Sequence, residues 1–202
     1  MTPATGIIAP DPVPVYASFP RLLTAADLAA LPSELPTGPV LYELDNGRLI
    51  VMPPPGDIHG ATEIKFAAKV FSEGEQRGHG VARCGEVAVV LWRNPDRVVG
   101  ADVAFITNAS LPIRLSPEGY LETIPELIVE IRSKNDTIPA IERKIADYFK
   151  AGVKVVLAPD PYKRTITVYR PGQTPVVLTE KDLLTIEDII PGLRIQVAEM
   201  FT

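Results

Sequence analysis

The chain has 202 residues, 46% of them hydrophobic and 22% charged, which is typical of a folded globular protein and excludes wholesale disorder. Its single cysteine, Cys84, excludes an internal disulfide framework and a thiolate zinc cluster, and favours a reducing compartment such as the cytoplasm. The net charge of −5 argues against a surface that attracts nucleic acid everywhere. No apolar run approaches the ~18 residues that a membrane span needs, and no secretory signal is recognisable.

The charge is unevenly distributed along the chain. Residues 130–172 contain nine Lys/Arg and five Asp/Glu and so carry +4, whereas the other residues together carry −9. A basic segment of this kind is typical either of a surface that faces phosphate or of an ordinary solvated face with mixed charges.

The N-terminal part divides into an arm and the start of a domain. Residues 1–22 are rich in proline and aperiodic, which predicts an extended arm. Residues 23–202 contain no break in composition and no repeat, so we expect a single domain there. Thr24 is expected to cap a short helix over Ala25–Leu31.

A hairpin and a long helix come next. Leu41–Leu44 and Arg48–Met52 flank Asp45-Asn46-Gly47, which is a strong hairpin signal. Asp57 is expected to begin a helix that runs to about Arg77, before Gly78. The apolar stripe expected to face the core consists of Ile58, Ala61, Ile64, Ala68 and Phe71.

The second half combines short strands with one more helix. The strand-like segments are Val87–Trp92, Asp102–Ile106, Leu127–Ile131, Val153–Leu157, Thr165–Tyr169, Pro175–Leu178 and Ile195–Val197. Asp136 or Thr137 is expected to cap a second long helix, with Pro139 in its first turn and Gly152 after its last. This order predicts an α/β (α+β) domain in which helices flank a mixed central sheet.

One strand carries a carboxylate where apolar residues are expected. Glu130 lies within Leu127–Ile131, and strand alternation puts it on the same face as Arg132. Because an unpartnered buried carboxylate is costly, Glu130 must be paired, hydrogen-bonded or bound to a metal ion. A simple Glu130–Arg132 ion pair and a functional role fit the pattern about equally.

A second strand breaks its pattern in the same way. Asp102 begins the apolar segment that ends at Ile106, and its plainest interpretation is a strand-end carboxylate that accepts backbone N–H groups. Together with Glu130, however, it would suit Mg²⁺, an ion that prefers oxygen ligands.

The second long helix supplies a cation at the edge of its apolar face. Ile141, Ile145 and Tyr148 form a narrow stripe, and Lys144 lies about 60° from it. Lys144 can therefore lie along the core and present its ammonium group at the boundary. By itself this pattern is more typical of an ordinary surface lysine near Asp147 or Glu142, and a functional role depends on Asp102 and Glu130 lying within reach.

The order of these pieces resembles a known family. Over nearly everything after residue 20, the chain is similar to the Uma-type restriction endonucleases, a bacterial family of the PD-(D/E)XK restriction-endonuclease-like superfamily. The matching pieces are Tyr42–Leu49, Met52–Gly56 with His59-Gly60, Ala101–Phe105, Pro125–Ser133, Lys144 with Tyr148 and Ala151–Val153, Asp160-Pro161, and Pro191–Leu193.

The resemblance implies a restriction-endonuclease-like fold and a metal site. It implies Mg²⁺, or Mn²⁺ in its place, held by the residues Glu43, Asp102, Glu130 and the backbone carbonyl of Ile131. Lys144 matches a helical lysine that replaces the strand lysine of the motif, and His59 matches a recurrent accessory histidine. Arg132 occupies the position of the motif lysine itself; it remains protonated and suits phosphate better than proton transfer.

Two functions follow as hypotheses. The first is a Mg²⁺-dependent endonuclease that hydrolyses DNA, in which Asp102, Glu130, Lys144 and Arg132 are catalytic. The second is a catalytically inactive relative that serves as a binding or assembly module, as Arg132 and the acidic net charge suggest. The hairpin and the proline-rich arm offer strand edges for a homodimer, and no membrane partner is expected.

Overall fold

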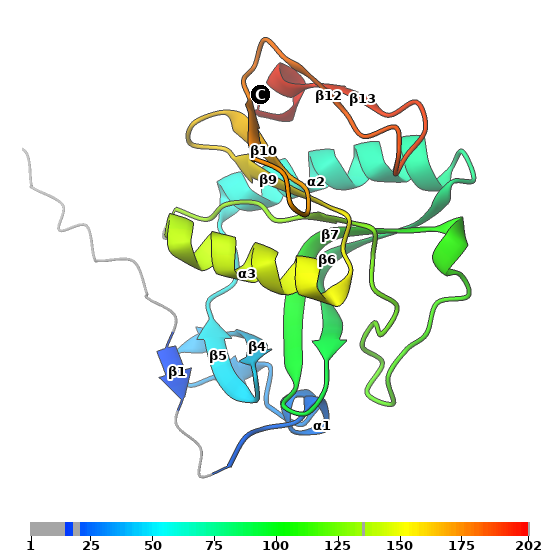
Figure 1. Cartoon of the computed structure of the whole chain (residues 1–202). Helices are drawn as coiled ribbons and strands as arrows, with labels where there is room; N and C mark the ends of the chain where they lie inside the picture. Colours follow the sequence, from blue (N-terminus) through cyan, green and yellow to red (C-terminus); the bar gives the residue numbers. More distant parts are fainter. Residues whose placement is uncertain (1–14, 18–20, 135, 202) are drawn as a thin grey trace, which may run out of the picture.

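A large mixed sheet organises the chain in this computed structural model, which describes residues 15–17, 21–134 and 136–201 (Figure 1). Nine strands form it, in the order β1-β5-β4-β7-β8-β9-β10-β11, with β6 also paired to β7. Their bounds are β1 Val15–Ala17, β4 Leu41–Asp45, β5 Arg48–Met52, β6 Gly80–Trp92, β7 Arg97–Thr107, β8 Leu127–Val129, β9 Val155–Asp160, β10 Thr165–Tyr169 and β11 Val176–Leu178. Strands β8 and β9 are parallel and the other pairs antiparallel, which confirms the predicted mixed α/β class.

Helices and two small sheets complete the described part of the chain. The helices are α1 Ala25–Ala29, α2 Asp57–Val70 and α3 Ile138–Ala151, with 3₁₀ turns at Asn108–Ser110 and Val197–Phe201. The small sheets pair β2 Glu34–Leu35 with β3 Gly38–Pro39, and β12 Leu183–Thr185 with β13 Arg194–Gln196. None of the described helices has the length and apolar character needed to span a membrane.

The helices α2 and α3 pack on opposite faces of the sheet. Successive side chains of β7 point to opposite faces. Accordingly Phe105 packs in the same cluster as Phe66 of α2, while its neighbour Ile106 packs in the same cluster as Tyr148 of α3. The sheet therefore separates two apolar cores, and each long helix closes one of them (Figure 1).

The expected orientation of α2 is wrong. The side that meets the core consists of His59, Thr62, Phe66 and Val70. Of the stripe expected to be buried, Ile58 is 50% exposed, Ile64 64% and Phe71 45%. The helix carries apolar residues on two sides, and the larger contact of Phe66 and Val70 with the sheet decides which side faces inward. The α-helix also ends at Val70, and a π-helical turn continues it over Phe71–Glu75.

The expected form of α3 is confirmed. Thr137, rather than Asp136, is the N-cap, and its hydroxyl accepts from the Ala140 amide. Gly152 ends the helix with a φ of 113°, a conformation that favours glycine. Ile145 and Tyr148 are buried against the sheet as the stripe predicts.

The predicted N-terminal arm contains a strand that the sequence did not indicate. Val15–Ala17, within the predicted arm, form β1 and pair with β5. Residues 1–14 and 18–20 of that arm lie outside the described part of the chain. The Thr24 cap of the short helix is confirmed, since Thr24 and Asp27 exchange hydrogen bonds as a capping box.

Candidate metal centre

A β-bulge stands opposite Asp102. Cys84 pairs with Val103 and Val87 with Ala101, so Gly85 and Glu86 together face the single residue Asp102. Glu86 has a φ of 55°, which is unusual for a residue with a side chain. The bulge turns the Glu86 carboxyl across Gly100, where an added Cβ would lie 2.6 Å from Glu86 Oε2. Bulges of this kind commonly re-aim a side chain beside a functional site.

The carboxylate of Asp102 joins three elements. Its Oδ2 accepts from the Ile131 amide at 2.6 Å, just beyond β8. Its Oδ1 lies 3.1 Å from Nε2 of His59 in the first turn of α2. The other ring nitrogen of His59 lies 3.4 Å from the Ser133 hydroxyl. Asp102 and His59 are both buried, so this junction is shielded from water.

Glu63 completes a group of three potential metal ligands. One ligand atom each from His59, Glu63 and Asp102 lies within 4.8 Å of the others. Two ligands of an octahedral Mg²⁺ are at most about 4.2 Å apart, twice the ~2.1 Å bond length, so a small movement would bring the three onto one ion. Glu63 Oε1 accepts from the Gly85 amide at 2.9 Å, which ties α2 to the bulge.

Glu130 is held by two residues of α3. The Lys144 ammonium lies 2.8 Å from Glu130 Oε2, and the Tyr148 hydroxyl donates to Glu130 Oε1. The two donors are four residues apart and so lie on the same face of the helix. Glu130 is thus partnered by Lys144 and Tyr148, not by Arg132.

The same lysine also binds Glu43 from the N-terminal hairpin. Lys144 Nζ lies 2.9 Å from Glu43 Oε1 and donates to the Gly100 carbonyl at 3.0 Å. Glu43 further accepts from the Gly100 amide, and its Oε2 lies 3.4 Å from Arg97 Nη1. The structure therefore places Glu43, Glu130 and Lys144 in one connected group.

Several acids at this centre hold their protons more tightly than usual. Burial, followed by the neighbouring Asp102 carboxylate, raises the pKa of Glu86 to about 7. Burial and the charge of Asp102 likewise raise the pKa values of Glu63 and Glu130, although Lys144 opposes the shift at Glu130. The raised pKa values reflect mainly the cost of burying a charged carboxylate and, to a smaller extent, repulsion by Asp102; a bound cation would reduce both.

The cations of the centre also hold their protons more tightly than usual, and for them the cause is the neighbouring carboxylates, which outweigh burial. Burial lowers the pKa of Lys144, but Glu130 and Glu43 outweigh it and hold this pKa well above its usual value. Burial alone would raise the pKa of Glu43, yet Lys144 and Arg97 reverse the shift and lower it. At His59, the hydrogen bond to Asp102 and the Asp102 charge overcome burial and raise the pKa.

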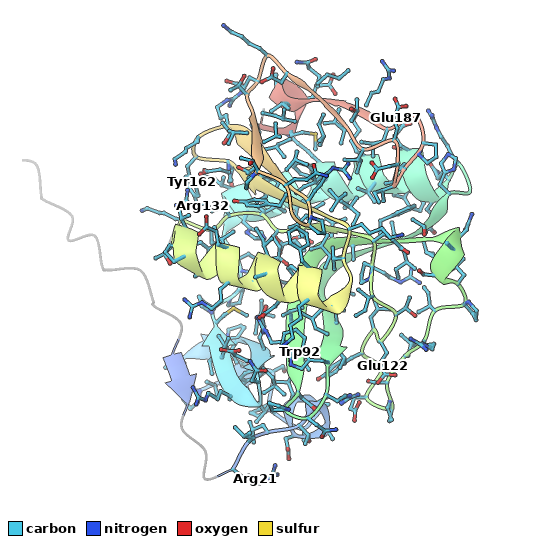
Figure 2. All side chains as sticks on the ribbon, in the orientation of Figure 1. Arg21, Trp92, Glu122, Arg132, Tyr162 and Glu187 are labelled. Atoms are coloured by element: carbon cyan, nitrogen blue, oxygen red, sulfur yellow. The ribbon has the colours of Figure 1, made fainter. Side chains whose placement is uncertain are left out.

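Arg132 lies apart from these carboxylates. Its guanidinium binds Asp160 Oδ2 at 2.7 Å and donates to the Asp136 carbonyl at 3.1 Å. Figure 2 shows it near the N-terminal end of α3, whereas Trp92 lies by the other end, where Lys150 stands 4.2 Å from its ring. The Glu130–Arg132 ion pair, one of the two alternatives that the sequence left open, is therefore not formed, and Arg132 pairs with Asp160 at the end of β9.

Sequence reasoning did not single out four residues of the centre, namely Glu63, Glu86, Arg97 and Tyr148, for these roles. A signal existed for Glu63 and Tyr148, which follow His59 and Lys144 by one helical turn. None existed for Glu86, because its position depends on a bulge that only strand pairing reveals. Arg97 reaches Asp147 of α3 and Glu43 across the sheet, which no local pattern could indicate.

The chain belongs to the Uma2 family. Residues 26–198 match the profile of this family, which is described as "Putative restriction endonuclease". The fold is similar to a crystal structure described as a putative nuclease from Anabaena variabilis, with a TM-score of 0.68 and 20% sequence identity. That similarity covers 85% of this chain and 93% of the other. No curated protein matches the sequence.

Proposed function

We propose that this protein is a Mg²⁺- or Mn²⁺-dependent endonuclease that hydrolyses phosphodiester bonds of DNA. One observation carries the proposal: Asp102 lies within reach of His59 and Glu63 on one side, and is tied to the Ile131 amide beside Glu130 on the other. Family membership supports the choice of a nuclease.

The donor set fits a hard divalent ion. Asp102 and Glu130 would supply carboxylates, the Ile131 carbonyl a neutral oxygen, and His59 and Glu63 further donors. Carboxylates suit Mg²⁺ and Mn²⁺, and an imidazole among them favours a transition ion such as Mn²⁺ over Mg²⁺. When bound, the ion would polarise the scissile phosphate and lower the pKa of a bound water.

The residues of α3 would orient the reacting groups. Because Glu130 and Glu43 keep Lys144 protonated, Lys144 would donate to a phosphoryl oxygen or orient the attacking water and would not act as a base. Tyr148 would hold Glu130 in place through its hydrogen bond. Glu43 has its oxygens directed to Lys144, Gly100 and Arg97, and in this proposal it positions the lysine.

An inactive binding or assembly module is the alternative. Arg132 stands at the position of the motif lysine, and its donors bind Asp160 and the Asp136 carbonyl. Under the endonuclease proposal, Arg132 would exchange its Asp160 contact for substrate phosphate, to which a guanidinium can donate twice.

The test is cleavage of a supercoiled plasmid with Mg²⁺, with Mn²⁺ and with a chelator. Asp102→Asn and Glu130→Gln remove charge while keeping side-chain shape, and each is expected to lower the nicking rate by at least about 10²-fold. Glu142→Gln, at an exposed position of α3, is the matched control and should cleave like the wild type.

Metal binding separates the two functions. Titration calorimetry with Mn²⁺ should give a site that is lost in Asp102→Asn and retained in Glu142→Gln. Equal nicking by the wild type and Asp102→Asn would contradict the endonuclease. The absence of a Mn²⁺ site that depends on Asp102, together with no cleavage of plasmid or single-stranded DNA, would favour the binding module.

A further inference from the structure

The two ring nitrogens of His59 face different partners. Nε2 lies 3.1 Å from Asp102 Oδ1, and Nδ1 lies 3.4 Å from the Ser133 hydroxyl. The His59 side chain is only 8% exposed, so both nitrogens depend on partners close by. The Ser133 hydroxyl therefore decides whether Nδ1 can hold a proton at low cost.

The geometry favours Nε2 as the nitrogen that would bind an ion. Adjacent ligands of an octahedral ion with bonds of ~2.1 Å are about 3.0 Å apart, close to the 3.1 Å between Nε2 and Asp102 Oδ1. Nε2 can bind an ion only through its lone pair, so the ring proton must then be on Nδ1. A buried N–H group needs an acceptor, and the Ser133 oxygen lies within reach of Nδ1.

A hydroxyl suits Nδ1 in every state of the ring. Without an ion, Nε2 carries a proton because the Asp102 carboxylate only accepts, and Nδ1 then accepts from Ser133 or, in a protonated ring, donates to it. With an ion on Nε2, Nδ1 donates. A hydroxyl can serve in either direction after its hydrogen rotates, whereas a carboxylate could only accept and a backbone amide could only donate.

The main chain holds Ser133 at this position. Its amide donates to Asp136 Oδ2 at 2.7 Å, and the Asp136 amide donates to the Ser133 carbonyl at 3.2 Å, which closes a turn before α3. Two residues before Ser133, the Ile131 amide donates to Asp102 Oδ2 at 2.6 Å. One short segment of the chain therefore positions the partners of both ring nitrogens.

We propose that Ser133 is a positioning residue of the candidate metal centre: its hydroxyl accepts the Nδ1 proton of His59 and so keeps Nε2 available to a divalent ion. This inference rests on the metal-dependent function proposed above, and it adds a residue that would contact the ring and not the ion. The loss of such a partner typically lowers metal affinity by about 10- to 100-fold.

The first test is titration calorimetry with Mn²⁺. Ser133→Ala should weaken binding by about 10- to 100-fold, because the Nδ1–H group loses its acceptor. Ser133→Thr keeps the hydroxyl and should bind like the wild type. Ser72→Ala, which removes a half-buried hydroxyl bonded to the Lys69 carbonyl at 3.3 Å, is the matched control and should also bind like the wild type.

The outcomes separate this role from the metal centre itself. Equal affinity of the wild type and Ser133→Ala for Mn²⁺ would overturn the role of Ser133 and leave the metal centre in place. A wild type that binds no Mn²⁺ would overturn the metal centre and, with it, this role.

The second test is ¹⁵N NMR of the histidine rings in the metal-free protein. The chain has two histidines, so His79 serves as an internal reference. The Nδ1 signal of His59 should shift in Ser133→Ala and stay in place in Ser133→Thr and Ser72→Ala, while the His79 signals remain unchanged. This measurement tests the hydrogen bond without any metal. An Nδ1 signal that is the same in the wild type and Ser133→Ala would overturn the proposal.

Discussion

The two long helices, α2 and α3, are each 14 residues long, cover opposite faces of the sheet, and deliver two polar residues to the centre. They differ in their patterns. Helix α3 has one apolar stripe. Tyr148 lies on that stripe and Lys144 at its edge, and both contact Glu130. Helix α2 has apolar residues on two sides and buries the side that carries His59.

The difference teaches that amphipathic spacing fixes orientation only when one stripe exists. In α3 the two buried residues, Ile145 and Tyr148, are those that the sequence predicts. In α2 the sheet accepts Phe66 and Val70, and His59 gains the Asp102 carboxylate, while Ile64 stays in solvent. For a helix with two apolar sides, the tertiary contacts decide which side is buried.

The largest expected effect is a difference in stability between substitutions on the buried and the exposed side of α2. Phe66 is fully buried, so Phe66→Ala should lower the free energy of unfolding by about 4 kcal/mol through lost burial and a residual cavity. Phe71→Ala, at a side chain that is 45% exposed, should cost less than about 1 kcal/mol. Urea denaturation of the wild type and both variants measures the two costs. Similar costs for the two phenylalanines would refute the assignment of sides.

A somewhat smaller effect is expected where α3 meets the acids. Lys144→Met leaves Glu43 and Glu130 without their shared cation and should lower the free energy of unfolding by about 3 kcal/mol. Arg143→Met, at the adjacent exposed position, should change it by no more than about 0.5 kcal/mol. Adding Glu130→Gln to Lys144→Met should recover part of the loss; if it recovers none, the pair is not coupled.

The smallest expected effect is a difference in pH dependence between the stabilisation by His59 of α2 and that by Lys144 of α3. Because the pKa of His59 is raised in the folded state, its stabilisation is complete below the usual histidine pKa and is lost as the pH rises through the raised value. In chelator, His59→Gln should therefore cost about 1.5 kcal/mol at about pH 6 and almost nothing at about pH 9. The cost of Lys144→Met should persist over that range, since the pKa of Lys144 is held well above its usual value.

The His59 measurement is a difference between variant and wild type, which both contain Glu86 with its pKa of about 7. Glu86 alone makes both proteins less stable as the pH rises through 7, because its raised pKa favours the protonated folded state. A cost of His59→Gln that does not change with pH would show that His59 contributes packing and no charge.

Much of the fold follows from local signals. The hairpin at Asp45-Asn46-Gly47, the caps of α1 and α3, and the strands β9 to β11 lie within a few residues of their expected positions. The strands β6 and β7 are longer than expected, since they begin at Gly80 and Arg97, and β12 had no clear signal. The extended parts of β6 and β7 pair with each other across a tight turn, and β12 pairs with β13, so these segments depend on partner strands and not on their own residue pattern.

By itself, the sequence determined which carboxylates are out of place, Asp102 and Glu130, and that Lys144 lies beside an apolar stripe. Burial makes such residues conspicuous because an unpaired charge in the core is costly. Only the tertiary structure decided their partners: Lys144 between Glu43 and Glu130, His59 and Glu63 beside Asp102, and Arg132 on Asp160. Partner choice depends on distances between elements far apart in the chain, and those distances exist only once the sheet has formed.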